Sequence, residues 1–544
     1  MAEEHDGILK SIDRRHFLQK AGAFATGSIF CGTITGCASY DINIPCLGPA
    51  AAPVPVSGMT YIRASQIGCA LDCDLKSGEN KFKSGRATDD GPRINAAMAG
   101  ASATNPITLI IDGSALVSGL FFPSGGHWGI AGLGCGTGFF VENGANNDCI
   151  HNGPPDAAIP FNPETLAPTR GMNVSLSNFA INGNQQRNST TGNRLGSNVA
   201  WYCGVNLMSL DHITIENLVV VNTPAFHIRL SNVGDVSVSG CVMQSEGSGT
   251  DGVHIDGPSN DIAVTNCRFM TGDDSIALNC PEGYGGDISS VQVSGCAFNS
   301  WSLMRLYTTI GGQNKFKISS VTVNECTGRF IEAAFLIGLA PGSLPQSIGS
   351  LSVSNCTLTT PTVLGMAENF GTIELQNVVF VPSWSTGTWS SPQANLTPAF
   401  LRPSPAIGTL SFEGTRLSFQ NCTIQRTRNS SVAAVILENQ SSIGNLEFNG
   451  FGLQDRGSYS ALRCLLNVEA GSIGELVIDS LNPANIEAPV ESGGFSMVGT
   501  VSGAEVLATG WDFPDSVMAD NVPYISASTG RPSIKIDGVV EPYP

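Results

Sequence analysis

Short stretches in which apolar and polar residues alternate recur along the middle of the chain at a nearly constant interval. Five of them share one form: four alternating residues, then a polar residue or glycine, then cysteine. Successive starts lie 26, 29, 30 and 30 residues apart, at Val236, Ile262, Val291, Val321 and Leu351. Alternation with a period of two predicts a half-buried β-strand. A fixed repeat of about 20–30 residues without helical periodicity predicts a β-solenoid.

The cysteines that end these stretches predict how the coils stack. Equivalent positions of successive coils form ladders along a solenoid axis, about 4.8 Å apart. We expect an inward ladder of free thiols, because buried cysteine packs as a small apolar side chain. Cys422 would extend it, whereas Cys69 and Cys73 lie outside it and are the better candidates for a disulfide. The ladder comprises Cys241, Cys267, Cys296, Cys326 and Cys356.

A second alternating run follows each cysteine. These runs occupy residues 226–229, 253–256, 276–279, 304–307 and 335–338. Aligned in that register, their first and third members point into the core, and their second and fourth members point outward onto one sheet. We expect the chemistry of the protein on this outward sheet. Its predicted members are His227, His254 and Arg305 in one stack, with Arg229, Asp256, Asn279 and Tyr307 beside them.

The two ends of the predicted solenoid differ from its centre. Residues 88–92 (Thr-Asp-Asp-Gly-Pro) are typical of a helix start, with proline in the first turn, and a short helix to Gly100 would cap the open strand edge. Turns that open with an Ile-Gly pair continue towards residue 480. We therefore expect an all-β protein, a single-stranded parallel β-helix with a short N-terminal capping helix, over residues 58–480. Residues 481–544 lack clear coils and are expected to form a C-terminal cap or an interaction segment.

Composition and charge narrow the possible functions. Glycine makes up 63 of 544 residues, about 12% against a usual level near 7%, which suits a fold with many turns. The net charge is 27 − 45 = −18. A chain this acidic is unsuited to nucleic acid, because phosphate contacts need clustered lysine and arginine. It is also not steered towards a polyanion at long range, which counts against highly charged pectate unless a groove is locally basic.

The first 57 residues have the pattern of an export signal followed by a tether. Residues 11–20, with the pair Arg14-Arg15, resemble a twin-arginine signal, and residues 34–37 (Ile-Thr-Gly-Cys) resemble a lipobox. We expect residues 1–37 to be a twin-arginine lipoprotein signal with Cys37 acylated, and residues 38–57 to be a Pro/Ala tether. The protein would then be exported by the Tat route and anchored by lipid on the periplasmic or cell-surface side of a membrane.

Two aspartate motifs lie one coil apart near the middle of the chain. They are Gly-Thr-Asp251-Gly at 249–252 and Gly-Asp273-Asp274-Ser at 272–275. They resemble the Asn-Thr-Asp-Gly and Gly-Asp-Asp-Cys motifs of family 28 glycoside hydrolases, the polygalacturonases. The capping segment similarly resembles the opening of the pectate-lyase-like superfamily. The resemblance implies a right-handed parallel β-helix and an exported enzyme that hydrolyses a pectin-like or other acidic glycan.

Two further motifs of that family are missing. Residues 299–304 stand where the family has Gly-His-Gly, and residues 334–338 stand where it has Arg-Ile-Lys. Residues 305–307 (Arg-Leu-Tyr) resemble the second motif only loosely and lie one coil early. In the family this cation pair binds the carboxylate of galacturonate, so the departure concerns the identity of the sugar more than hydrolysis.

Inverting hydrolysis needs one protonated carboxyl at the leaving oxygen and one carboxylate that activates water, about 6.5–9.5 Å apart. The resemblance implies Asp273 as the acid, with Asp251 and Asp274 sharing the role of base. A sugar groove favours forked donors and aromatic rings. No metal or cofactor is expected for this reaction. The predicted substrate-binding residues are His254, Arg305, Tyr307, His227 and Arg229.

Two other classes of function stay open on the sequence. Asp251, Asp256, Asp273 and Asp274 could hold Ca²⁺ in a polysaccharide lyase or epimerase, with Arg305 as the base. Alternatively, the aspartates only cap turns, and the chain is a non-catalytic surface or glycan-binding protein on a β-helix scaffold.

Overall fold

The structure is a computed structural model that describes most of the chain after residue 55. It describes residues 56–544 apart from 135, 155–164, 195–197, 311–312, 315, 339–345, 384–396, 404–410, 430, 439, 459–462, 469–470, 482–487, 493–497, 504–505 and 507–510. The predicted signal with Cys37, and all but the last two residues of the predicted tether, lie outside the described residues. Among those described, no helix has the length and apolar character needed to cross a membrane.

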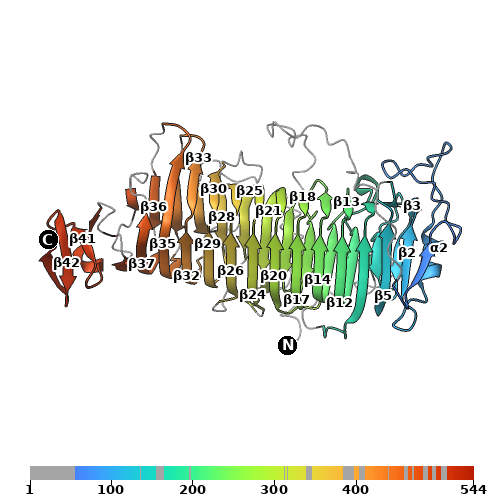
Figure 1. The fold of residues 1–544 in the computed structure, drawn as a ribbon, viewed down its shortest axis with the longest axis horizontal. Helices are drawn as coiled ribbons and strands as arrows, with labels where there is room; N and C mark the ends of the chain where they lie inside the picture. The colour runs from blue at the N-terminus through green and yellow to red at the C-terminus, as the bar shows by residue number, and fades with distance from the viewer. Residues whose placement is uncertain are drawn as a thin grey trace, which may run out of the picture.

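A single parallel sheet of 35 strands winds along the long axis of the molecule, so the predicted all-β parallel β-helix is confirmed (Figure 1). Its strands fall into three ladders, one for each face of the coil. The first ladder contains β1 (Thr60–Arg63), β2 (Ile107–Ile111), β5 (Gly126–Gly132), β8 (Gly171–Ser177), β12 (Val205–Glu216), β14 (Ile228–Ser239), β17 (Ser259–Thr265), β20 (Ile288–Ser294), β24 (Ile318–Asn324), β26 (Ile348–Ser354), β29 (Phe370–Gln376), β32 (Glu413–Gln420), β35 (Ser442–Asp455), β37 (Ser472–Leu481) and β39 (Val498–Ser502).

The second ladder carries the outward sheet predicted from the sequence, and the third ladder closes the coil. The second contains β4 (Leu120–Phe122), β7 (Ile150–Asn152), the beginnings of β12 and β14, β16 (Val253–Asp256), β19 (Asp274–Asn279), β21 (Ala297–Tyr307), β25 (Thr327–Ile337), β28 (Thr362–Met366), β31 (Ala399–Pro403), β34 (Val432–Leu437), β36 (Arg463–Val468) and β38 (Ala488–Ser492). The third contains β3 (Ser114–Val117), β6 (Gly138–Val141), β9 (Ala180–Asn182), β13 (Val219–Val221), β15 (Val242–Gln244), β18 (Arg268–Met270), β27 (Thr357–Thr360), β30 (Val379–Pro382), β33 (Thr423–Arg426) and parts of β21, β25 and β35.

The cysteine ladder forms as predicted. Its five members and Cys422 are buried and free, and the backbone N–H of Cys267 donates to Sγ of Cys296 at 3.3 Å. The residue before each cysteine adopts a left-handed backbone conformation, for example Gly240 at φ 63° and Asn266 at φ 54°. Glycine and asparagine tolerate that conformation best, which explains why a polar residue or glycine always precedes the cysteine.

The N-terminal cap is confirmed, and the predicted disulfide is wrong. Helix α2 (Gly91–Met98) lies at the end of the first coils, with Ile94 and Met98 buried beneath it (Figure 1). Asn95 accepts the backbone N–H of Phe121 at 2.8 Å and so ties the helix to β4. Cys69 and Cys73 are both free and buried, and they pack as apolar side chains instead.

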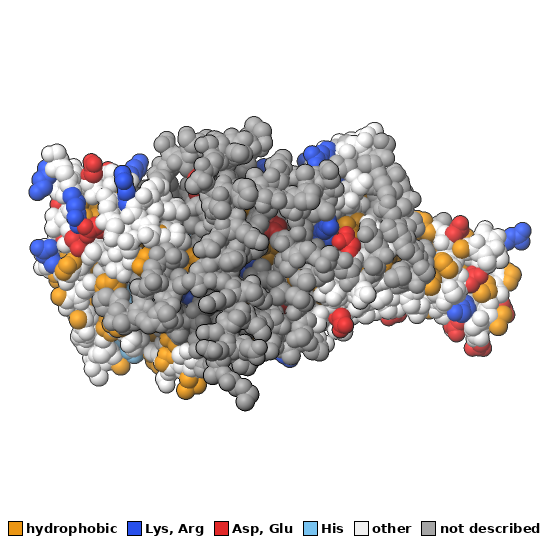
Figure 2. Space-filling view, turned by 180° about the vertical axis from the view of Figure 1, so that it is seen from behind, with side chains coloured by type: hydrophobic (Ala, Val, Ile, Leu, Met, Phe, Trp, Pro, Cys, Tyr) orange, Lys and Arg blue, Asp and Glu red, His pale blue; other side chains and the backbone are white. Residues whose placement is uncertain are grey.

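The solenoid continues one coil beyond the predicted boundary at residue 480, since β38 and β39 still pair in parallel with β36 and β37. A separate four-stranded sheet then follows. It consists of β40 (Asp512–Phe513), β41 (Pro523–Ser526), β42 (Arg531–Ile536) and β43 (Val539–Pro542). Figure 2 shows hydrophobic side chains exposed among charged ones on this C-terminal sheet, where Val539 is 60% exposed. The remaining described elements are two short hairpins, β10 (Thr191–Arg194) with β11 (Asn198–Trp201) and β22 (Thr309–Ile310) with β23 (Gln313–Asn314), and two 3₁₀ turns, η1 (Gln185–Arg187) and η6 (Asp515–Val517).

Candidate active site

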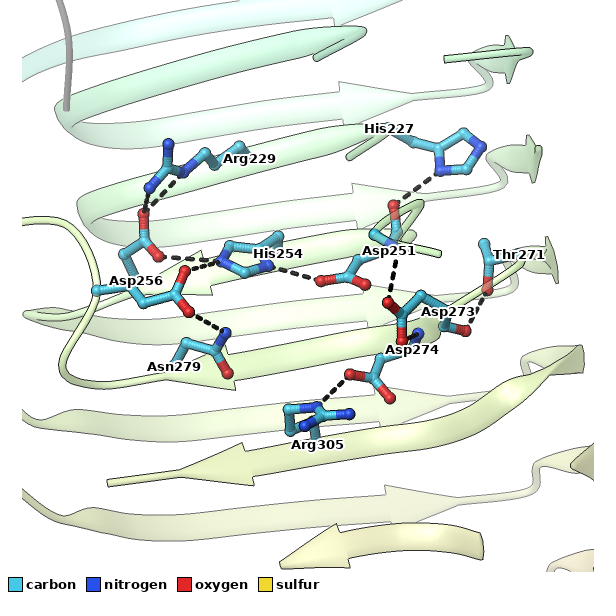
Figure 3. A network of polar contacts seen from close by, with 12 residues as sticks. His227, Arg229, Asp251, His254, Asp256, Thr271, Asp273, Asp274, Asn279 and Arg305 are labelled. Atoms are coloured by element: carbon cyan, nitrogen blue, oxygen red, sulfur yellow. Dashed lines mark hydrogen bonds and ion pairs between the residues drawn. The ribbon is translucent and has the colours of Figure 1, made fainter. Parts of the chain in front are cut away.

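The two aspartate motifs meet at one corner of adjacent coils. Asp251 lies two residues before β16, and Asp274 is the first residue of β19, which pairs with β16 in parallel. The backbone N–H of Gly252 donates to the carbonyl of Asp274 at 3.0 Å and joins the two corners. One carboxylate oxygen from each of Asp251, Asp273 and Asp274 lies within 4.8 Å of the others (Figure 3). The structure therefore brings together the three residues predicted to be catalytic, which we call the aspartate trio.

The closest oxygens of the trio are nearer to one another than the separation of about 6.5–9.5 Å expected for an acid and a base. Asp251 and Asp274 are fully buried, whereas Asp273 is half-buried. Negative charges this close repel, so they disfavour simultaneous ionisation of all three groups. Oδ1 of Asp251 is buried without a hydrogen-bond partner among the described residues.

A buried histidine contacts the carboxylate of Asp251. Nδ1 of His254 lies 2.7 Å from Oδ2 of Asp251, and its Nε2 lies 3.1 Å from both Asp256 and Glu282. Burial alone lowers the pKa of His254, but hydrogen bonds to these three carboxylates outweigh burial and raise the pKa to about 10. These contacts favour the charged imidazolium form of His254.

An arginine supports Asp274 in the same way. Asp274 accepts hydrogen bonds from Nε of Arg305 and from the hydroxyl of Ser302, the latter at 2.6 Å. Both partners come from β21, the next coil of the second ladder. Burial lowers the pKa of Arg305, whereas the charges of Asp274 and Asp273 raise it further, so the net direction is upward and the guanidinium stays charged.

Sequence reasoning missed Glu332, a fourth carboxyl group beside the trio. The indole N–H of Trp301 donates to its Oε2, and the backbone N–H of Trp301 donates to the carbonyl of Asp273 at 3.2 Å. Burial raises the pKa of Glu332 to about 7; Arg305 and the indole N–H oppose this, and Asp274 adds to it. Its other oxygen is buried without a partner among the described residues. Glu332 belongs to none of the recurring motifs, so no pattern pointed to it.

Glu282 was also missed. It lies in the connection from β19 to β20, outside the recurring motifs, and Nδ2 of Asn279 donates to its Oε1 at 3.0 Å. Only the three-dimensional structure places Glu282 against His254.

The prediction of substrate binding is wrong for three residues. His227, Arg229 and His254 are at most 2% exposed, and protein groups occupy their polar atoms, so they offer no surface to a substrate. His227 bonds to the carbonyl of Asp251 at 2.8 Å and to Ser245 at 2.9 Å, and burial lowers its pKa to about 4.

The predicted alignment of the outward sheet is right for four of the five runs and wrong for one. His254 pairs with Ala277, and Ala277 pairs with Arg305, as expected. The residue opposite His254 on the preceding coil is Arg229, however, so that register is shifted by two positions from the prediction. A shift of two leaves the same faces buried, so the hydrophobic pattern cannot detect it. Tyr307 is half-buried opposite Asn279.

The four aspartates proposed for calcium do not gather. Asp256 lies with His254 and Glu282 on the other side of the imidazole, away from the trio (Figure 3). Ca²⁺ takes about six to eight oxygen ligands, and two of the three remaining carboxylates already hold a cationic side chain. The residues present therefore do not fit the calcium alternative.

No curated protein sequence matches the chain. Similar solved structures include the family 28 exopolygalacturonase of Yersinia enterocolitica, with 10% identity, coverage of 76% of this chain and 79% of that chain, and a TM-score of 0.47. They also include the surface protein and adhesin PfbA of Streptococcus pneumoniae, with 11% identity, coverage of 75% and 100%, and a TM-score of 0.47. The endo-xylogalacturonan hydrolase of Aspergillus tubingensis has 13% identity, coverage of 75% and 96%, and a TM-score of 0.38.

One family model matches part of the chain. The model of glycosyl hydrolases family 28 matches residues 175–331. This stretch contains both aspartate motifs together with His254, Glu282 and Arg305. This part of the chain is therefore similar to glycosyl hydrolases family 28.

Proposed function

We propose, with this similarity to family 28 as the premise, that the protein hydrolyses glycosidic bonds of a polysaccharide with inversion, at the aspartate trio. The observation that carries the proposal is the meeting of Asp251, Asp273 and Asp274 within 4.8 Å, with a cationic side chain on each of Asp251 and Asp274. The proposed substrate is a pectin-like or other acidic glycan, which the family match supports.

The two cations divide the roles within the trio. His254 and Arg305 place positive charges against Asp251 and Asp274, the two members that act as carboxylates in the proposed reaction. Two neighbouring negative charges in turn favour the protonated form of Asp273, which is also the most exposed member. Asp273 gives its proton to the glycosidic oxygen as that bond breaks. Water attacks the anomeric carbon from the opposite face, and its proton passes to Asp251 or Asp274.

The substitution Asp273→Asn tests the proposal. The amide keeps the shape of the side chain but cannot donate the proton, so activity should fall by about 10²–10⁴-fold while the fold persists. Reducing-sugar release across a panel of acidic and neutral glycans measures activity, and circular dichroism checks folding. Asp261→Asn is the matched control, because Asp261 is an exposed aspartate outside the trio.

Three outcomes contradict the proposal. Full activity of the Asp273→Asn variant means that Asp273 is not the acid of the reaction. Products with a new double bond, detected by ultraviolet absorbance, indicate a lyase. Absence of hydrolysis across the whole panel favours a glycan-binding or scaffold role.

We further propose that the protein acts outside the cytoplasm, exported by the Tat route and held at a membrane through acylated Cys37. The arginine pair at 14–15 followed by the lipobox-like residues 34–37 supports this location. A glycan-degrading enzyme needs access to polymers outside the cell, which agrees with such an anchor.

A further inference from the structure

His254 lies at the centre of a buried group of charges that the proposed reaction does not use directly. Its two ring nitrogens contact three carboxylates: Asp251 on one side, and Asp256 with Glu282 on the other (Figure 3). His254 and Asp256 are fully buried, and Glu282 is 2% exposed. Because water does not reach these groups, their charges interact strongly and must be balanced within the protein.

The position of the imidazole is fixed on several sides. The ring of Phe226 stacks on it with centroids 3.8 Å apart and planes at 10°. Arg229 donates to Asp256 from Nε at 2.9 Å and from a terminal nitrogen at 2.8 Å, and Asn279 donates to Glu282. Asp256 and Glu282 are thus held in place by further residues, and they in turn hold Nε2 of His254.

The charges of this group favour an imidazolium over a metal-bound imidazole. Three carboxylates face His254, and Arg229 neutralises one of them. A proton on each ring nitrogen lets His254 donate to carboxylates on both sides, which a neutral ring cannot do. The same side chains are close enough to hold a cation. A divalent ion would lie close to the guanidinium of Arg229, however, which already occupies Oδ2 of Asp256.

We propose that His254 is a positioning residue for the reaction, a charged imidazolium that orients Asp251 and places a positive charge against its carboxylate. This inference rests on the proposed hydrolysis at the trio. Oδ2 of Asp251 is engaged by His254, and Oδ1, which has no partner among the described residues, accepts the proton of the attacking water. The groups facing His254 from its neighbours are Asp251, Asp256, Glu282 and the ring of Phe226. The rise in the pKa of His254 to about 10 agrees with this role.

The activity test is His254→Gln, whose amide keeps a hydrogen bond to Asp251 but removes the charge. Loss of an adjacent opposite charge raises a carboxyl pKa by about 1–3 units. The base must be deprotonated to work, so the acid limb of the kcat/KM profile should move up by about 1–3 pH units. The value of kcat should fall while KM changes little, because His254 does not touch the substrate.

His227→Gln is the matched control. His227 is an equally buried histidine that contacts the backbone carbonyl of Asp251, not its carboxylate, and the hydroxyl of Ser245. Burial lowers its pKa to about 4, which favours the neutral ring. Its replacement should leave the acid limb in place. A merely structural role for His254 predicts a loss of activity by the same factor at every pH, and that result overturns the proposal.

A second measurement needs no activity and no variant that folds poorly. Nitrogen NMR of histidine-labelled wild-type protein at pH 8 should show protons on both ring nitrogens of His254 and a neutral His227. A neutral His254, or loss of its ring protons when Zn²⁺ or Mn²⁺ is added, overturns the proposal. If the imidazolium is present but no glycan is hydrolysed, the proposed function fails and the positioning role fails with it, while the assigned charge stands.

Discussion

Glu332 offers a quantitative test of the electrostatics beside the trio. Its pKa is raised from 4.5 to about 7, with burial as the main cause. A carboxyl group whose pKa is higher in the folded than in the unfolded protein does not destabilise the fold at a pH below its unfolded pKa. The destabilisation grows as the pH rises from the unfolded pKa to the folded pKa, and it is constant above that. The difference of 2.5 pKa units corresponds to about 3 kcal/mol at pH 8, at about 1.4 kcal/mol per unit, and to less than about 1 kcal/mol at pH 5.

The substitution Glu332→Gln removes the ionisation but keeps an oxygen that accepts the indole N–H of Trp301. We expect this variant to be more stable than the wild type by about 3 kcal/mol at pH 8 and nearly equal at pH 5. Urea unfolding at both pH values, followed by tryptophan fluorescence and circular dichroism, measures the change in midpoint. Glu413→Gln is the control, because Glu413 is exposed and should show no gain that depends on pH. The reasoning is refuted if the gain is the same at both pH values, or if Glu332→Gln is the less stable protein at pH 8.

Two further predictions concern the cysteines. The ladder thiols at 241, 267, 296, 326 and 356 should be inert to a thiol reagent in native protein and react after unfolding, because they are buried; burial also raises the pKa of the neighbouring Cys422 to about 12. The ladder is contradicted if all five thiols react with the reagent in native protein, or if they do not react after unfolding. Cys37→Ser should move the exported protein from the membrane to the soluble fraction, and an already soluble wild type after export rules out the lipid anchor.

The repeat could be predicted from the sequence because successive coils place similar residues at equivalent positions. An alternating strand, a left-handed turn residue and a buried cysteine recur in five successive coils, and each repeats the same steric requirement. The end of the solenoid was less predictable. The last coil, with β38 and β39, lacks the cysteine and the Ile-Gly opening, so the predicted boundary fell one coil early.

The site could be predicted only where the chemistry lies in a contiguous motif. Asp251, Asp273 and Asp274 were found because two short motifs lie one coil apart. Glu282 lies in the connection after β19, and Glu332 lies within β25, both outside the recurring motifs. Their contacts with His254 and Trp301 on neighbouring coils become visible only in the structure. The burial of His227 could not be read from alternation either, because it precedes β14 and bonds to a backbone carbonyl.

The corrected register also explains how an acidic chain accommodates so many buried carboxylates. Arg229, His254, Ala277 and Arg305 occupy one row across four neighbouring strands of the second ladder. Three of the four carry positive charge, and carboxylates flank the row on both sides: Asp256 and Glu282 at one, the aspartate trio at the other (Figure 3). Removing one partner of a buried ion pair leaves an uncompensated charge that costs about 3–5 kcal/mol. Each cation in this row therefore balances a buried carboxylate, and His254 and Arg305 also hold Asp251 and Asp274 of the trio in place. The structure of the sheet and the proposed chemistry depend on the same side chains.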